Sequence, residues 1–233
     1  KPHAPPPPLP PAVILLNDPH LKKPYKKIEK QVSHYDFVFC AQKEGAEKLR
    51  RRKKVRTLWV PLGCDPEIHR KINLEKKFDV AFVGTEGKKS LRGALLKKIK
   101  ERYPKSFLGI AEYTKISEIY SSAKIGFNYS IRNDINMRMF EAMSCGSLLL
   151  TNYIKNNGLE ELLKDREHLV IYRNPKELYK LIDYYLSHPE EREQIAYAGH
   201  QLVTSHHRYR DRLNTIFDYI RASDPHRYRE LTL

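Results

Sequence analysis

A regular alternation between short apolar segments and longer amphipathic ones is the feature that most constrains how this chain can fold. Apolar runs rich in β-branched and aromatic residues, such as residues 12–16 (AVILL) and 35–40 (YDFVFC), alternate with segments that have the spacing of helices. This pattern predicts parallel strands joined by right-handed helical crossovers. We therefore expect an α/β protein.

The alternation falls into two blocks, separated by a Pro/Gly/Asp loop at residues 61–70 (PLGCDPEIHR). The first block predicts strands at 12–16, 35–40 and 57–60, with helices at 25–34 and 41–52. The second predicts strands at 79–83, 106–111, 125–129, 147–151 and 168–172, with helices at 89–103, 116–122, 137–144 and 159–163. Three closing helices are predicted at 175–187, 189–203 and 209–221, and the first two open on a proline.

These blocks predict four parts. Residues 1–11 (KPHAPPPPLPP) form a proline-rich arm, because a run with so few N–H donors supports neither helix nor ladder. Residues 12–70 form a partial amino-terminal Rossmann-like domain of only three strands, and residues 71–205 form a complete carboxy-terminal one. Residues 206–233 form a last, helical part.

The formal net charge of +15 points to an anionic partner. The densest basic run, residues 43–56 (KEGAEKLRRRKKVR), has eight basic and two acidic positions. A solvated helix face is the preferred interpretation, followed by contact with an anionic membrane surface. Nucleic acid comes last, because no stacking aromatics are interleaved and no nucleic-acid-binding motif is found.

Neither a membrane-spanning apolar run nor a signal peptide is visible, so we expect a cytoplasmic protein, with peripheral membrane contact as the alternative. The three cysteines, Cys40, Cys64 and Cys145, lack the spacing of a disulfide framework or a zinc site. They are expected to be reduced and buried, and we expect no metal site.

Chemistry is expected at the carboxyl ends of the second block's strands, where helix N-termini favour anions. After the strand at 79–83, Gly84 permits close backbone approach and Arg92 supplies a cation, although an ordinary basic first turn explains both equally well. The sequence has neither a Walker A loop nor a GxGxxG fingerprint there.

The segment at 135–151 (INMRMFEAMSCGSLLLT) carries the sharper signal. Arg138 and Glu141 lie three residues apart on one face of a helix that follows a strand, where a guanidinium can clamp a diphosphate and a carboxylate can accept both hydroxyls of a ribose. The alternative is an Arg–Glu pair on the helix surface. Asn133 and Asn136 can be explained as helix-capping residues, and Gly146 as a left-handed C-cap.

In this order, several segments resemble the group 1 glycosyltransferases of the GT-B fold, most closely the spore-maturation-protein-like subgroup. The markers run from about residue 18 to 212: LLNDPH, YDFVFCAQKEGAEKLR, PLGCDPEIH, DVAFVGT, YSSAKIGFNYS, INMRMFEAMSCGSLLLTN and HRYRDR. The resemblance implies metal-independent transfer of a sugar, with retention of configuration, from a UDP- or GDP-linked donor to an unidentified acceptor. It implies no other cofactor, and it implies that the helix in residues 206–233 crosses back to the first domain.

The resemblance also implies roles for individual residues. The donor would be held by Gly84, Arg92, Asn133, Asn136, Arg138 and Glu141. Glu141 matches the second glutamate of the family's Glu-x7-Glu motif, the ribose ligand, and Asn133 replaces the first, which contacts the donor sugar. Base selection would depend on backbone groups at 111–113.

The amino-terminal part bears on acceptor binding. Asp18 and His20 follow the first predicted strand and are candidates for acceptor contact or acid/base catalysis, although Asp-Pro also initiates turns. Because only part of an amino-terminal domain is predicted, a nucleotide-sugar-binding module that is incomplete for catalysis is a second hypothesis. A basic scaffold for membrane or nucleic acid is the third. The sequence does not determine the oligomeric state.

Overall fold

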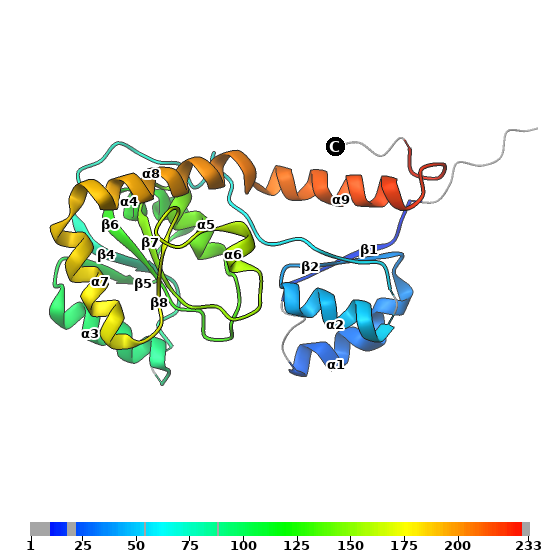
Figure 1. Cartoon of the computed structure of the whole chain (residues 1–233), viewed down its shortest axis with the longest axis horizontal. Coiled ribbons are helices and arrows are strands. Elements are labelled where there is room, and N and C mark those ends of the chain that lie inside the picture. The colour runs from blue at the N-terminus through cyan, green and yellow to red at the C-terminus, as the bar shows by residue number, and fades with distance from the viewer. Residues whose placement is uncertain (1–9, 18–21, 54, 88, 230–233) are drawn as a thin grey trace, which may run out of the picture. The chain divides into compact units, whose positions relative to one another are not determined.

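The computed structural model describes residues 10–17, 22–53, 55–87 and 89–229 (Figure 1). The chain divides into two compact units. Unit 1 comprises the chain up to residue 61 together with residues from 210 onward, and unit 2 comprises residues 62–209. We describe each unit by itself.

Unit 1 is built on a three-stranded parallel sheet. Its strands β1 (Val13–Leu16), β2 (Phe37–Cys40) and β3 (Thr57–Trp59) lie in the order β1-β2-β3. Helix α1 (Lys22–Gln31), the short 3-10 helix η1 (Val32–His34) and helix α2 (Lys43–Lys53) connect them. The first block of the sequence therefore has the predicted strand and helix order.

Alternating side chains of β2 divide the core of unit 1 into two layers, because successive residues of a strand face opposite sides. Val38 and Cys40 pack with residues of α1 and α2, including Leu49. Phe37 and Phe39 pack on the other face, against Ile220 of helix α9 (Tyr209–Ser223) and against Tyr228.

The basic run on α2 makes several contacts within unit 1. The ammonium of Lys48 lies 4.1 Å from the ring centroid of Tyr25, and that of Lys43 lies 5.5 Å from the ring of Trp59. Arg50 donates to the carbonyl of Thr57 at 3.0 Å. Part of this charge is thus used in the unit's own packing.

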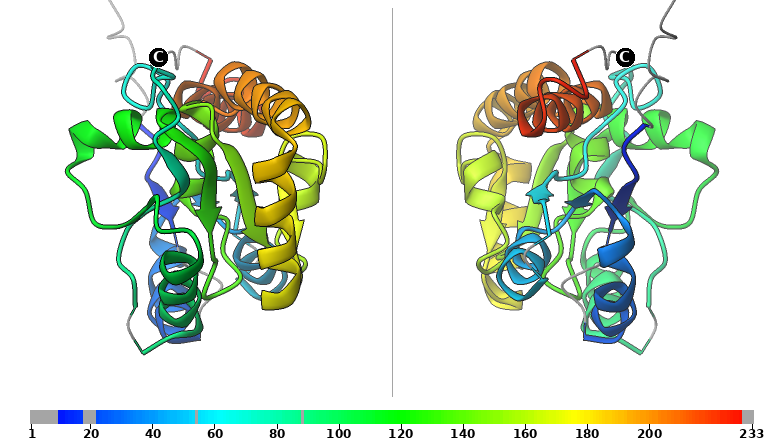
Figure 2. Two further views of the ribbon diagram at one scale, coloured as in Figure 1. Left: turned by 90° about the vertical axis from the view of Figure 1, so that its left-hand side faces the viewer. Right: turned by 90° about the vertical axis from the view of Figure 1, so that its right-hand side faces the viewer.

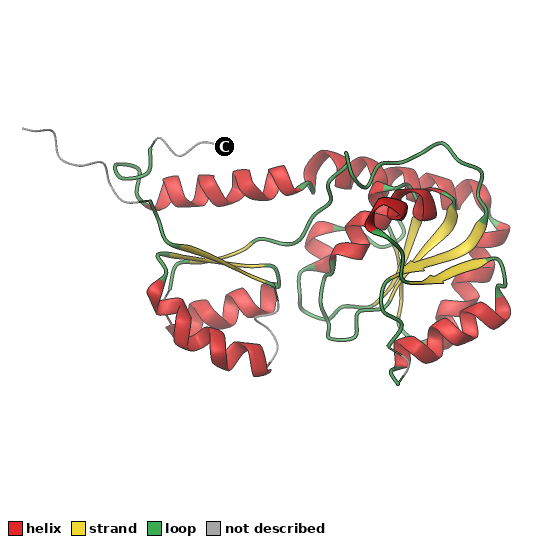
Figure 3. Cartoon of the chain, turned by 180° about the vertical axis from the view of Figure 1, so that it is seen from behind, coloured by secondary structure: helices red, strands yellow, loops and turns green. Residues whose placement is uncertain are grey.

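Unit 2 is built on a five-stranded parallel sheet (Figure 3). The strands lie in the order β5-β4-β6-β7-β8 and are β4 (Phe78–Val83), β5 (Ser106–Gly109), β6 (Ala123–Asn128), β7 (Leu148–Asn152) and β8 (Val170–Tyr172). The order reverses at β4, because the chain visits β5 on one side of it before passing to β6 on the other.

Helices cover both faces of this sheet (Figure 2). They are α3 (Leu91–Arg102), the 3-10 helix η2 (Tyr113–Lys115), α4 (Ile116–Ser121), α5 (Met137–Ser144), α6 (Leu159–Leu162), α7 (Pro175–Ser187) and α8 (Pro189–His206). One hydrophobic core joins α3 and α7 to one sheet face, which presents Phe82 and Phe127. Helices α4 and α5 contact β4, β6 and β7.

The predicted elements of the second block are confirmed in type and order, with small shifts of their ends. Helix α8 continues to His206, three residues beyond the predicted end, and Thr204 Oγ1 bonds back to the carbonyl of His200 at 2.8 Å. Gly146 follows α5 with φ +79°, as predicted for a left-handed cap. The three cysteines are buried and are not joined in disulfides, as expected.

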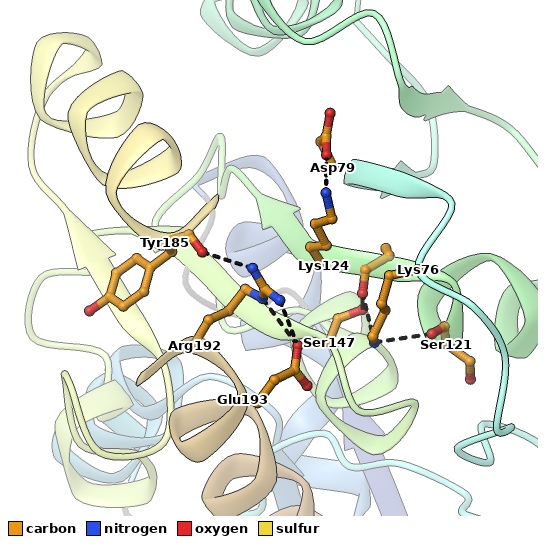
Figure 4. A network of polar contacts seen from close by, with 9 residues as sticks. Lys76, Asp79, Ser121, Lys124, Ser147, Tyr185, Arg192 and Glu193 are labelled. Atoms are coloured by element: carbon orange, nitrogen blue, oxygen red, sulfur yellow. Dashed lines mark hydrogen bonds and ion pairs between the residues drawn. The ribbon is translucent and has the colours of Figure 1, made fainter. Parts of the chain in front are cut away.

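A polar network supports the amino ends of the unit 2 strands (Figure 4). Lys76 Nζ donates to the carbonyls of Ser121 at 3.0 Å and Ala123 at 2.9 Å. Lys124 at the start of β6 pairs with Asp79 of β4 at 2.6 Å. Because ligands of open parallel sheets bind at the opposite, carboxyl ends, we assign this network a structural role.

Within the described parts of the chain, no helix is both long and apolar enough to cross a membrane.

Candidate functional site

The switch point of the unit 2 sheet lies between β4 and β6, whose carboxyl ends lead into loops 84–90 and 129–136. Open parallel sheets bind ligands in the crevice at this point, outside the carboxyl ends of the strands. Helix α5 begins directly after the second loop, so its first turn lies at this edge of the sheet. The loops and the helix that carry the predicted site residues therefore meet at one edge of the sheet.

Arg138, in the first turn of α5, joins the ends of both strands. Its Nε donates to the carbonyl of Val83 at 2.7 Å, and its Nη1 donates to Asn128 Oδ1 at 3.0 Å. Asn128 is itself held by Thr151, whose hydroxyl accepts from Nδ2 at 2.9 Å. The guanidinium also lies 4.3 Å from the ring centroid of Phe82. Arg138 is thus held in one orientation by two strands and an aromatic face.

Gly84 is required because the Arg138 guanidinium occupies the space beside it. A Cβ at Gly84 would lie 2.5 Å from Arg138 Nη2, and its φ of +146° is a conformation that L side chains rarely adopt. Nη2 makes no hydrogen bond to the described residues. Gly84 thus lets the Arg138 guanidinium lie against the backbone, with Nη2 as an N–H donor group beside the loop that follows β4. The predicted close approach of a ligand at this glycine stays a prediction.

Arg92 supplies a second guanidinium. Its Nη2 donates to the carbonyl of Thr85 at 2.6 Å, and its Cζ lies 5.6 Å from the centroid of the Phe82 ring that Arg138 also covers. The pKa of Arg92 is lowered, first by burial and then by the positive charge of Arg138. Two cations held this close repel each other, so a bound anion would be stabilised by both.

Glu141 lies one helical turn beyond Arg138. Its side chain is 13% exposed. Burial raises its pKa, and the nearby charge of Arg138 opposes that shift. The alternative of a simple Arg–Glu pair on the helix surface does not describe this geometry, because the Arg138 hydrogen bonds go to Val83 and Asn128. Glu141 is instead a largely buried carboxylate one helical turn from a fixed guanidinium.

Asn133 makes structural hydrogen bonds that fix the loop before α5. It has a left-handed φ of 60°. Its Nδ2 donates to the carbonyl of Lys155 at 2.7 Å, and its Oδ1 accepts from the Lys155 N–H at 2.7 Å. Asn157 also donates to the Asn133 carbonyl at 2.7 Å. A donor-sugar contact by Asn133 remains a prediction, and such a contact has to compete with these bonds.

Asn136 occupies the N-cap position of α5 with an extended backbone, as expected. Its side chain makes no capping hydrogen bond, however, and its Oδ1 is buried without a partner among the described residues. Capping by the side chain is therefore the wrong explanation for this asparagine. A buried acceptor without a partner at the N-terminus of α5 is consistent with a ligand contact by Asn136. That contact remains a prediction.

His69 is a member of the site that the sequence does not mark, because the composition of the loop at 61–70 predicts only a boundary between the two blocks. Its ring lies 3.6 Å from the Glu141 carboxylate, measured from Nε2 to Oε1, and its side chain is 2% exposed. Tyr113 packs edge-on against it, with ring centroids 5.4 Å apart. No local sequence pattern marks this contact, since His69 and Glu141 meet only in the folded unit. The predicted acceptor residues Asp18 and His20 lie outside the described residues.

Unit 2 is therefore an open parallel sheet with two guanidiniums, those of Arg92 and Arg138, at its switch point. A family model described as glycosyl transferase-like matches residues 66–218. The chain belongs to this glycosyl transferase-like family. No curated protein sequence matches it significantly.

Several solved structures have a fold similar to that of this chain. Sucrose-phosphate synthase (tll1590) from Thermosynechococcus elongatus matches 84% of this chain at 14% identity with a TM-score of 0.64. Anabaena Alr3699/HepE, solved in complex with UDP and glucose, matches 90% at 12% identity with a TM-score of 0.72. The pneumococcal O-GlcNAc transferase GtfA, in complex with UDP and GlcNAc, matches 85% at 12% identity with a TM-score of 0.61.

These similarities confirm the predicted GT-B-like fold class, with a full Rossmann-like unit and a partial one. This chain spans 61% of the sucrose-phosphate synthase chain, 71% of HepE and 47% of GtfA.

Proposed function

We propose that unit 2 binds the nucleoside diphosphate of a sugar donor and that the protein transfers the sugar to an acceptor hydroxyl or similar group. The observation that carries this proposal is the pair of guanidiniums, Arg92 and Arg138, held over one aromatic ring at the switch point. The diphosphate would lie against this pair, and Glu141 would accept hydrogen bonds from the ribose hydroxyls. Membership of the glycosyl transferase-like family supports the proposal.

In this mechanism the two arginines neutralise the negative charge that develops on the departing diphosphate. Fixed cations stabilise developing charge strongly, because they need no reorganisation during the reaction. We propose that this replaces a divalent metal ion. UDP is the first donor nucleotide to test, because the HepE and GtfA structures contain it, and GDP is the second.

Calorimetry with UDP and GDP tests donor binding. The wild-type protein is expected to bind one of them, and Arg138→Ala and Glu141→Ala are each expected to weaken that binding. Binding of neither nucleotide, or binding that both variants leave unchanged, would contradict the proposal. Added EDTA should leave both binding and transfer unchanged if no metal ion takes part.

The second hypothesis is a nucleotide-sugar-binding module that needs further chain for catalysis. It is favoured by the three strands of unit 1. Donor hydrolysis or transfer, measured by release of UDP from UDP-glucose, separates the two hypotheses. Binding without release supports the module. The acceptor roles of Asp18 and His20 and the assignment to the spore-maturation-protein-like subgroup remain proposals.

The basic run on α2 is the basis for one additional proposal, that the same enzyme also binds peripherally to an anionic membrane surface. Co-sedimentation with phosphatidylserine vesicles at low and high salt tests it, because attraction of this kind is screened by ions. Neutralising Arg50 and Arg51 should weaken the binding. Binding that is independent of salt would exclude this role.

A further inference from the structure

The backbone of His69 is fixed on both sides of the residue. Its N–H donates to the carbonyl of Asp65 at 2.7 Å, closing the turn. Its carbonyl accepts from the Ser144 hydroxyl, at the end of α5, at 2.6 Å. The preceding carbonyl, that of Ile68, accepts from Ser117 Oγ at 2.6 Å. The imidazole is therefore held beside α5 by its own backbone.

The imidazole itself is buried without a hydrogen bond. Neither ring nitrogen has a hydrogen-bond partner among the described residues, although the side chain is only 2% exposed. Buried polar atoms are nearly always hydrogen-bonded, and an exception calls for a functional or structural explanation. The Nε2 of His69 lies 3.6 Å from Glu141 Oε1, which is a few tenths of an ångström longer than a hydrogen bond.

We propose that His69 is a positioning residue for Glu141: its Nε2–H donates to the carboxylate and holds it in the orientation that accepts the ribose hydroxyls. This inference rests on the proposed function, because it assumes that Glu141 binds ribose. A carboxylate that receives two hydroxyls must present its oxygens in one orientation, and a second donor behind it restricts its rotation.

The surroundings favour a neutral imidazole that donates one proton. Burial lowers the pKa of His69, and the nearby charge of Asp65 opposes this shift. Glu141 can then carry the single negative charge of the pair. Tyr113 packs edge-on against the imidazole, at an interplanar angle of 87°. The imidazole has no exposed edge, so it acts through Glu141 and does not touch the nucleotide itself.

The test compares UDP with 2′,3′-dideoxy-UDP, which lacks the hydroxyls that Glu141 is proposed to bind. Hydrogen bonds to a charged group are expected to give the wild-type protein an affinity for UDP at least about 10-fold higher than for the dideoxy analogue. His69→Ala should reduce this ratio toward unity and leave the affinity for the analogue unchanged. His69→Gln should keep part of the ratio, because its amide nitrogen can donate from near the Nε2 position. Calorimetry measures all of these values.

Two further variants complete the experiment. Glu141→Gln should abolish the preference, and the double variant His69→Ala/Glu141→Gln should be no worse than Glu141→Gln alone, since both residues act on the same contact. His168→Gln is the matched control, because His168 precedes β8 at the amino end of its strand and pairs with Glu167. It should keep the wild-type ratio.

The outcomes separate this inference from the proposed function. If His69→Ala weakens binding of UDP and of the dideoxy analogue equally, His69 only packs the core and the inference is overturned. The inference also fails if Glu141→Gln loses the ratio while both His69 variants keep it. If the wild-type protein binds neither nucleotide, the proposed function itself fails.

Discussion

Replacing Arg138 with lysine tests the site most directly, because the substitution keeps the charge and removes the planar fork. The guanidinium donates to Val83 and Asn128 and leaves Nη2 beside Gly84. A lysine ammonium cannot satisfy both protein acceptors and also present a donor to a diphosphate.

The expected loss follows from one charge-assisted hydrogen bond, which contributes about 1.5–3 kcal/mol. This corresponds to UDP binding that is weaker by a factor of about 10 to 150. Uridine carries no phosphate, so its affinity should change little. Calorimetry with both ligands measures the ratio. Arg102→Lys, at the far end of α3, is the matched control and should leave the ratio unchanged.

Gly84→Ala should reproduce much of this loss, because its Cβ would displace Arg138 Nη2 and the left-handed backbone would be strained by about 1–3 kcal/mol. The double variant Gly84→Ala/Arg138→Lys should lose less UDP affinity than the sum of the single losses. The reasoning is refuted if Arg138→Lys binds UDP within about twofold of wild type. An equal loss for UDP and uridine in a folded variant would also refute it.

Three further predictions concern stability and reactivity. Glu141→Gln should raise the melting temperature of the unliganded protein near neutral pH. Burial raises the pKa of Glu141, so its ionised form destabilises the folded state. The difference in melting temperature between the variant and the wild type should shrink as pH falls through that pKa. A melting temperature equal to or below wild type would contradict this. Lys76→Ala should lower the free energy of unfolding by about 1–3 kcal/mol, because the carbonyls of Ser121 and Ala123 lose their donor. It should leave the affinity for UDP unchanged. Urea titration measures the first effect and calorimetry the second. Burial raises the pKa of Cys40 and Cys145 to about 12, so both thiols should resist alkylation until the protein unfolds. Mass spectrometry detects the alkylated residues. Rapid labelling of both thiols in the native protein would contradict this prediction.

Much of the fold was predictable because its signals are local. The apolar alternation predicted the strand and helix order of both units, and Pro175 marked the start of α7. The structure adds an N-cap there, since the Glu177 N–H donates to Asn174 Oδ1 at 2.9 Å. Gly146 marked the end of α5 for a similar reason, since a residue with left-handed backbone is needed there.

The site was predicted in part. Arg138, Arg92 and Gly84 were identified from their place after strands, and the structure brings these three together at the switch point. Their partners were not predicted, because Val83 and Asn128 lie on two different strands whose adjacency is decided by the sheet order.

By itself, the sequence determined which segments become strands and helices, since side-chain periodicity and caps act within a few residues. Only the tertiary structure decided the contacts that join distant segments. The buried imidazole of His69 meets Glu141 because the turn at 65–69 is fixed onto α4 and α5. The unpartnered Oδ1 of Asn136 is likewise a result of packing. Burial and long-range contact depend on how the layers assemble, which local spacing does not specify.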